Sequence, residues 1–266
     1  MSINDEGFLS VEIKDWIEKH HKENSVEFSI ADRLRKLGQR VLFASQPKRN
    51  NNRQLIVSIL FVRVLSHFQG AILLVERGMV ADTKILVRVM CEATFSLGAC
   101  VKDENFVDEL VKDDRHREAD LVRSLLEIPQ EHIGLTDKEI EDLRQRQTRL
   151  RAQAKEENPK RLGAFAIAKR AGLLRQYHLI YALLSNTVHA AVRDLDSHVN
   201  ADTEGEIFSL KWGPDDREGV IYALWSAIDV FFTALSMMLD CFPQNDAANE
   251  LKKLRDERST LLEPQK

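Results

Sequence analysis

The chain has 266 residues, of which 44% are hydrophobic and 30% charged, and its formal net charge is −4. This composition is typical of a soluble globular protein, and the negative charge excludes a whole-protein basic field that would attract nucleic acid. Only 11 glycines and 6 prolines are present, so long stretches lack helix breakers, which favours helices over strands.

Hydrophobic periodicity predicts roughly nine or ten helices. In chain order they cover about 11–20, 29–45, 54–77, 83–102, 103–127, 137–156, 161–171, 174–195 and 219–241, with one strand-like segment at 207–212 and a polar tail from 243 that suits one more helix. Asp82 is the expected N-cap of the fourth helix, and Thr136 with Glu139 forms a capping box before the sixth. We therefore expect an all-α fold in a single domain, 1–266. Its core lies at about 54–242, with peripheral N-terminal helices at 8–45 and a polar tail at 243–266.

The chain carries no readable signal for export or membrane insertion. The first ten residues, MSINDEGFLS, have neither the basic nor the apolar region of a signal peptide. The apolar segment 220–239 is long enough to span a bilayer, but Asp229 near its centre costs about 2.5–3.5 kcal/mol on insertion scales. Cys91, Cys100 and Cys241 show no CxxC spacing and are interpreted as buried thiols of a reducing compartment. We expect a cytoplasmic protein without a membrane helix.

Polar side chains recur at helical spacing on helices that are otherwise apolar. Arg88 and Glu92 are four residues apart and share one helix face, and so do Ser185 and His189 on a later helix. Buried charges must be paired, so we expect one inter-helical network. In it Arg63 and Arg88 would balance Glu92 and Asp229, with His67 and His189 as further members. Such a network serves either as a reaction site, because burial shifts pKa values, or as a structural ion-pair lattice.

Two resemblances bear on the choice between these roles. The pattern H-x3-A-I-x-L-x3-G-x3-D-x3-L-x-R-x3-E from His67 to Glu92, followed by Y-x3-S-x3-H at Tyr181, Ser185 and His189, resembles an uncharacterised bacterial helical family over about 55–200. This resemblance implies that Arg88, Glu92, Ser185 and His189 belong to one site. It brings no activity with it.

The segment Arg193-Asp194-Leu195-Asp196-Ser197-His198 resembles the Arg-x4-6-His signature of HEPN domains. These are helical bundles that often dimerise and in many members cut RNA without a metal. The resemblance implies an up-and-down HEPN-like core, a homodimer and a metal-independent ribonuclease or toxin-type effector, in the setting of phage defence. His189 or His198 would be the acid/base, Arg88 and Arg193 would hold the phosphate, and Glu92 would orient them.

Other chemistries lack their sequence signals. No HExxH motif, no Cys/His cluster and no two Glu-x-x-His motifs from paired helices are present for a metal, and no Gly-rich loop is present for a nucleotide cofactor, so we expect neither. The sixth predicted helix carries Arg144, Arg146, Arg149 and Arg151, which either form a solvated face or contact RNA or a protein partner. The alternative to the nuclease is a non-enzymatic helical scaffold or regulatory interaction module, whose buried polar network only fixes helix register.

Overall fold

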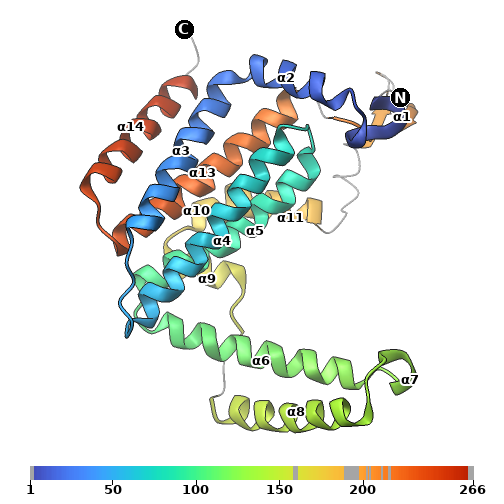
Figure 1. The fold of residues 1–266 in the computed structure, drawn as a ribbon, viewed down its shortest axis with the longest axis vertical. Helices are drawn as coiled ribbons and strands as arrows, with labels where there is room; N and C mark the ends of the chain where they lie inside the picture. Colours follow the sequence, from blue (N-terminus) through green and yellow to red (C-terminus); the bar gives the residue numbers. More distant parts are fainter. Residues whose placement is uncertain are drawn as a thin grey trace.

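The computed structural model describes residues 3–157, 161–188, 198–201, 203, 205–210, 212–214 and 217–262 (Figure 1). Over these residues the chain is an all-α bundle, as the sequence predicts, with one short β-hairpin. The N-terminal elements are α1 (Ile3–Glu6), the short turn η1 (Gly7–Leu9), α2 (Ile13–Glu23), α3 (Ser25–Ala44), α4 (Asn52–Val75) and α5 (Val80–Lys102). They are followed by α6 (Phe106–Leu126), α7 (Gln130–Ile133), α8 (Asp137–Glu157), α9 (Ala164–Ala171), α10 (Leu174–Gln176), the π-helical turn η2 (Tyr177–Tyr181) and α11 (Ala182–Val188). The strands β1 (Val199–Ala201) and β2 (Ile207–Leu210) precede α13 (Arg217–Cys241) and α14 (Asn245–Leu262).

Helix α13 lies at the centre of the bundle. It packs against α3, α4, α5 and α14, which accounts for its apolar surface on nearly every side (Figure 1). The ring of Phe231 stacks on Phe68 of α4 at 4.4 Å between centroids and lies 5.8 Å from Phe61. Helix α5 is the second central element, since it packs against α4, α9, α11 and α13. The candidate site described below is built on α5.

The core extends further along the chain than expected. Leu34, Leu37 and Val41 of α3 and Leu251 and Leu254 of α14 are buried in the same apolar cluster as α13. The two outer helices are also joined by ion pairs, Arg33 to Glu257 and Arg40 to Glu250, each at 2.5 Å. Residues outside the expected core of 54–242 therefore help to bury α13.

Helices α6 and α8 form a hairpin that projects from the bundle (Figure 1). Its small apolar cluster is centred on Ala119, Val122 and Leu150. The capping box is confirmed: Glu139 Oε2 accepts from the Thr136 backbone N–H at 2.8 Å, and Thr136 Oγ accepts from the Glu139 N–H at 3.4 Å. The exposed faces of α8 account for its almost wholly polar sequence.

Three local predictions are revised. Helix α5 begins at Val80 with Met79 as its N-cap residue, so the prediction of Asp82 as N-cap is wrong, and Asp82 lies in the first turn. The tight connection at Gly78, with φ +69°, lets α5 start three residues earlier. The helix predicted at 174–195 is interrupted at η2, and residues 189–195 lie outside the described part. The strand-like segment pairs antiparallel with β1, which the sequence did not predict.

Among the described residues, two helices are long and apolar enough to cross a membrane by length and composition alone, α4 and the segment Glu218–Cys241 of α13. In the most apolar 18-residue stretch of each helix, 67% of α13 is buried inside the bundle and 33% of α4. Length and composition are weak evidence for a membrane span, because core helices of soluble proteins share them.

Candidate functional site

Arg88 of α5 joins two segments that lie about ninety residues apart in the sequence. Its Nη2 donates to the hydroxyl of Tyr181 at 3.1 Å, and its Nε donates to Ser185 Oγ at 3.3 Å. Tyr181 and Ser185 are four residues apart at the junction of η2 and α11, and Ser185 in turn donates to the Tyr181 carbonyl at 2.9 Å. The spacing of four on both sides places two polar pairs face to face.

Glu92, one turn after Arg88, completes this group. Its Oε1 accepts the Tyr181 hydroxyl hydrogen at 2.9 Å and lies 3.3 Å from Arg88 Nη2. The Arg88 guanidinium also lies over the Tyr181 ring, 5.0 Å from its centroid. We call Arg88, Glu92, Tyr181 and Ser185 the α5–α11 cluster. Arg88, Glu92 and Ser185 were predicted to share a site, and the structure brings them together.

The two charged groups of the cluster, Arg88 and Glu92, differ in how deeply they are buried. The Arg88 side chain is 17% exposed and that of Glu92 43% exposed, so the arginine is the group withdrawn from water. Since Arg88 bonds to three protein groups, its charge is compensated without a ligand. The prediction that Arg88 holds a phosphate therefore gains no support from the geometry, and its contacts are those of a positioning residue.

Tyr181 is held in its neutral form. Burial raises its pKa above the ordinary value, and the hydrogen bond to Glu92 raises it further. The ring packs edge-on against Phe95 at 5.8 Å and stacks with Tyr177 at 5.1 Å. At neutral pH the hydroxyl is thus available as a donor. Tyr181 is present in the sequence motif but was missed as a site residue, since neither its orientation nor its partners can be derived from spacing.

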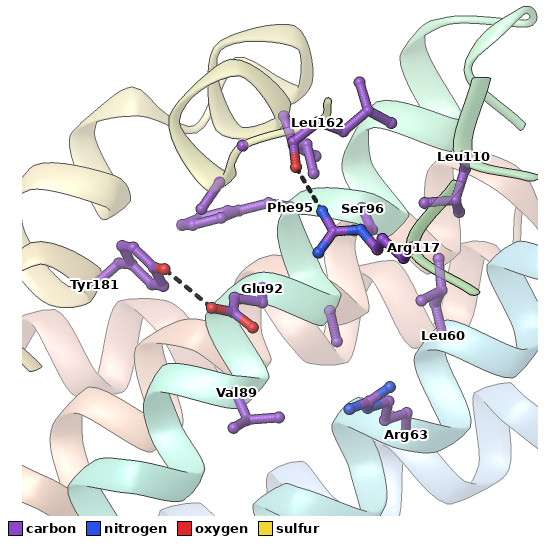
Figure 2. A pocket seen from close by; sticks show the side chains of 14 residues that line it. Leu60, Arg63, Val89, Glu92, Phe95, Ser96, Leu110, Arg117, Leu162 and Tyr181 are labelled. Carbon is purple, nitrogen blue, oxygen red and sulfur yellow. Dashed lines mark hydrogen bonds between the residues drawn. The ribbon is translucent and has the colours of Figure 1, made fainter. Parts of the chain in front are cut away.

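A cavity of about 490 Å³ opens beside the cluster (Figure 2). Glu92 and Tyr181 line one side, Ser96 and Phe95 lie on its wall, and α4 and α6 supply an arginine each, Arg63 and Arg117. Figure 2 shows these two guanidinium groups on the side of the cavity away from Tyr181, and Glu92 between them and the phenol.

The two arginines of the cavity differ in their ties to the protein. Arg117 Nε donates to Asp113 at 2.6 Å and its Nη2 to the Leu162 carbonyl at 3.1 Å. The Arg63 side chain is exposed and has no hydrogen bond or ion pair within the described part of the chain. Arg117 is paired with Asp113 and Glu92 with Arg88, so the charge of Arg63 favours an anion in the cavity, and Arg63 is the group free to bind it.

His67 lies one turn after Arg63 but does not line the cavity. Burial lowers the pKa of His67, and the neighbouring Arg63 charge lowers it further. Its Nε2 is buried and has no hydrogen-bond partner among the described residues. The ring is consequently neutral at neutral pH, and no contact joins it to the α5–α11 cluster in that part of the chain.

Asp229 belongs to a different network, so the prediction of a single network is wrong. Its carboxylate pairs with Arg258 of α14, not with Arg63 or Arg88. Burial raises the pKa of Asp229 in spite of this pairing. Arg258 was missed, because a polar tail helix gives no sign of which core residue it covers.

The remaining predicted residues are placed as follows. His189 and Arg193 lie outside the described residues. His198 is exposed and lies directly before β1, and no contact among the described residues connects it with the cluster. On α8, Arg146 pairs with Glu118 and Arg144 lies 3.8 Å from Glu141. Arg149 and Arg151 are exposed and form no ion pair with other described residues.

The part of the chain that the structure describes contains neither a metal site nor a reactive thiol. No group of three His, Cys, Asp or Glu side chains there could hold a metal ion. Cys91, Cys100 and Cys241 are free thiols, and burial raises the pKa of all three, that of Cys100 to about 12. These thiols are therefore protonated and unreactive at neutral pH.

The chain matches the model of a known protein family. A family model described as "Family of unknown function (DUF5677)" matches residues 54–207, which is more than half of the chain, so the chain belongs to this family. The matched segment contains the whole α5–α11 cluster and leaves out α13 and α14. No curated protein and no solved structure matches the chain.

Proposed function

We propose that this member of the DUF5677 family is a metal-independent ribonuclease of the HEPN-like kind, which binds RNA at the cavity beside Glu92 and Tyr181. The observation that carries the proposal is the cavity itself: two guanidinium groups, a carboxylate and a neutral phenol line a space of about 490 Å³. Cavities of this size accommodate a nucleotide-sized group. Arginine is the side chain best suited to a phosphodiester, because its fork of N–H donors matches the phosphate oxygens.

The phosphate binds at Arg63, whose guanidinium has no competing partner among the described residues. Arg117 lies on the same side, but Asp113 compensates its charge, so it adds a fixed guanidinium group to the cavity wall without net charge. Glu92 and Arg88 act indirectly, as positioning residues. They hold Tyr181 and Ser185, and therefore the turn that runs directly into His189 in the sequence.

His189 is the proposed acid/base, a role that rests on its sequence position four residues after Ser185. It removes the proton from a ribose 2′-hydroxyl, the 2′-oxygen attacks phosphorus and the bond to the 5′-oxygen breaks. A proton from water completes the new 5′-hydroxyl, and the other product ends in a 2′,3′-cyclic phosphate. Positive charge from Arg63 stabilises the phosphorane-like transition state, so the reaction uses no metal.

The alternative is a non-enzymatic helical scaffold or regulatory module. One observation favours it specifically: Arg88 is fully engaged by Tyr181, Ser185 and Glu92, as in a structural ion-pair lattice. In that case the cluster fixes the register of α5 against α11 and the cavity has no substrate.

The deciding experiment incubates the purified chain with labelled RNA in EDTA. The ribonuclease proposal expects cleavage products with 2′,3′-cyclic phosphate ends, at least about 100-fold slower formation in His189→Ala, since general acid–base catalysis contributes about 10²–10⁴, and clear slowing in Arg63→Ala. His198→Ala tests the other histidine, and Arg49→Ala is the matched control, because Arg49 is an exposed arginine that does not line the cavity. If the folded wild type leaves RNA intact and its expression does not slow growth, while Arg88→Ala still lowers the melting temperature, the scaffold replaces the nuclease.

The cellular side of the proposal follows from the HEPN-like resemblance. A toxin-type ribonuclease active in phage defence would act in the cytoplasm and as a homodimer. Expression of the wild type is then expected to arrest growth, and size-exclusion chromatography with light scattering is expected to give twice the chain mass. A monomer that still cleaves RNA would support the proposed ribonuclease activity and contradict the proposed homodimer.

A further inference from the structure

A second cavity, of about 670 Å³, lies between α10 with η2, α13 and α14. Its charged lining comes from Arg175, Asp229, Arg255 and Arg258, and its aromatic lining from Tyr222, Trp225 and Phe232. Helices α13 and α14 lie outside the segment that matches the family, and no residue of this cavity lines the first. We call it the α13–α14 cavity.

Its charge is strongly one-sided. Three guanidinium groups and only one carboxylate, that of Asp229, line the cavity, and Asp229 is already paired with Arg258. Arg255 donates to Ser236 at 2.9 Å. Arg175 is exposed at the rim and has no hydrogen bond or ion pair with another described residue. The cavity therefore has positive charge left over for an anionic group.

Two buried polar atoms at this cavity also lack partners within the described part of the chain, Nε of Arg258 and Oε1 of Gln176. The orientation of the Gln176 amide follows from its neighbour. Thr233 donates its hydroxyl hydrogen to the Asp229 carbonyl at 3.2 Å, so Thr233 Oγ can only accept, and the Gln176 NH₂ group must face it. One acceptor on Gln176 and one donor on Arg258 are thus left for a ligand, and a buried polar group without a partner costs about 1–3 kcal/mol.

Planar groups dominate the remaining wall. The Cζ atom of Arg258 lies over the Trp225 ring, 5.4 Å from its centroid, and that of Arg255 lies over the Phe232 ring at 5.6 Å, so both guanidinium groups lie over aromatic rings. Tyr222 is 46% exposed, and no guanidinium group of the described residues lies over its ring. Aromatic rings and guanidinium planes of this kind are the surfaces on which nucleobases stack.

We infer that the α13–α14 cavity binds a free nucleotide. The phosphate binds at Arg175 and the free Nε of Arg258, the base lies against Tyr222, and the Gln176 oxygen accepts a hydrogen from an amino group of the base. An uncharged aromatic ligand would leave the guanidinium groups unused, and inorganic phosphate would leave the aromatic wall unused. The combination of the two is what selects a nucleotide.

The site also touches the turn that carries Tyr181. Residue Ile180 of η2 lines the α13–α14 cavity, and Tyr181, the next residue, belongs to the α5–α11 cluster. π-helical turns are often found at functional sites. Ligand binding on one side of η2 therefore acts on a segment whose other side bonds to Arg88 and Glu92. Nucleotide binding itself does not depend on the ribonuclease proposal.

Isothermal titration calorimetry of the full-length chain with AMP tests the inference, with adenosine and inorganic phosphate as separate arms. The expected result is saturable AMP binding, weaker by at least about tenfold for each partial ligand and in Arg175→Ala, where tenfold corresponds to about 1.4 kcal/mol. Arg175 is exposed, so its loss leaves the fold intact. Arg149→Ala, which removes an exposed arginine from α8, is expected to bind AMP as the wild type does.

Three outcomes would overturn the inference. The first is the lack of any saturable heat with AMP at about millimolar concentration, where a Kd of 1 mM corresponds to about −4.1 kcal/mol. The second is AMP binding that is as tight in both Arg175→Ala and Tyr222→Ala as in the wild type. The third is binding of a short RNA, but not of AMP, that is lost in Arg175→Ala, because the cavity would then hold part of an RNA chain.

Discussion

Tyr181 donates its phenolic hydrogen to Oε1 of Glu92 across 2.9 Å, and this bond joins two helices that the sequence separates by almost ninety residues. The same oxygen lies 3.3 Å from Arg88, which also holds Tyr181 from the other side. Tyr181, Glu92 and Arg88 therefore form a set of three polar groups in which each group bonds to the other two. The stability of this set can be measured separately from any activity.

Removal of Arg88 is expected to destabilise the fold. In Arg88→Met the hydroxyls of Tyr181 and Ser185 each lose a charge-assisted donor, and the Glu92 carboxylate loses its counter-ion. Because Glu92 is 43% exposed, solvent screens part of this loss, so we expect about 1–3 kcal/mol. At about 2–4 °C per kcal/mol for a chain of this size, the melting temperature falls by roughly 2–12 °C.

A double-mutant cycle with Tyr181→Phe identifies the origin of that loss. Tyr181→Phe keeps the ring contacts with Phe95 and removes the bonds to Arg88 and Glu92. If Arg88 acts through the hydroxyl, the two substitutions together cost clearly less than the sum of their separate effects. Simple additivity would show that Arg88 stabilises the fold through packing alone.

The pairing within one helix was predictable from sequence and the pairing between helices was not. A spacing of four residues on an apolar helix places Arg88 and Glu92 on one face whatever the tertiary structure. The Thr136–Glu139 capping box is equally local. By contrast, Asp229 could not be assigned to Arg258, since nothing in a polar tail helix specifies which side of the core it covers. Tyr181 was hidden for a related reason, because its partners come from a helix far away in the sequence.

Arg258 and Asp229 are expected to respond unequally to substitution. Burial raises the pKa of Asp229, so the folded state holds its proton more tightly than the unfolded chain. The stability linked to this group is therefore fully present below the unfolded pKa of about 3.9 and is lost as the pH rises through the folded value. At pH 7 the buried carboxylate depends on Arg258. We expect Arg258→Met to lower the melting temperature at pH 7 much more than Asp229→Asn does.

Scanning fluorimetry at pH 7 and pH 4 checks this expectation. The difference between the two variants should shrink at pH 4, where the carboxyl takes up a proton and needs its partner less. Equal losses for both variants at pH 7 would mean that the ion pair itself, and not the cost of a lone buried carboxylate, controls stability there.

The stability linked to His67 is expected to depend on pH in the opposite direction. Burial and the Arg63 charge lower its pKa, so the unfolded chain binds this proton more readily than the folded one. The corresponding stability is present above the unfolded pKa of about 6.5 and is lost as the pH falls through the folded value. His67→Gln is expected to reduce the drop in melting temperature between pH 7 and pH 5. An identical drop in the wild type and the variant would assign the acid sensitivity to other groups.

Gly38 of α3 is expected to tolerate no side chain, because a Cβ atom there would lie 2.6 Å from the Phe231 ring. Phe231 is fully buried and stacks on Phe68, so it has no free space into which to move. Overpacking of this kind costs about 1–3 kcal/mol, which at 2–4 °C per kcal/mol lowers the melting temperature of Gly38→Ala by roughly 2–12 °C. Gly163→Ala is the matched control, since a Cβ there meets nothing within 4 Å and its φ of −82° suits any residue. Chemical denaturation of the two variants side by side measures the difference. Equal stability would mean that α3 is not seated on α13 at this contact, and hence that the central position of α13 needs revision.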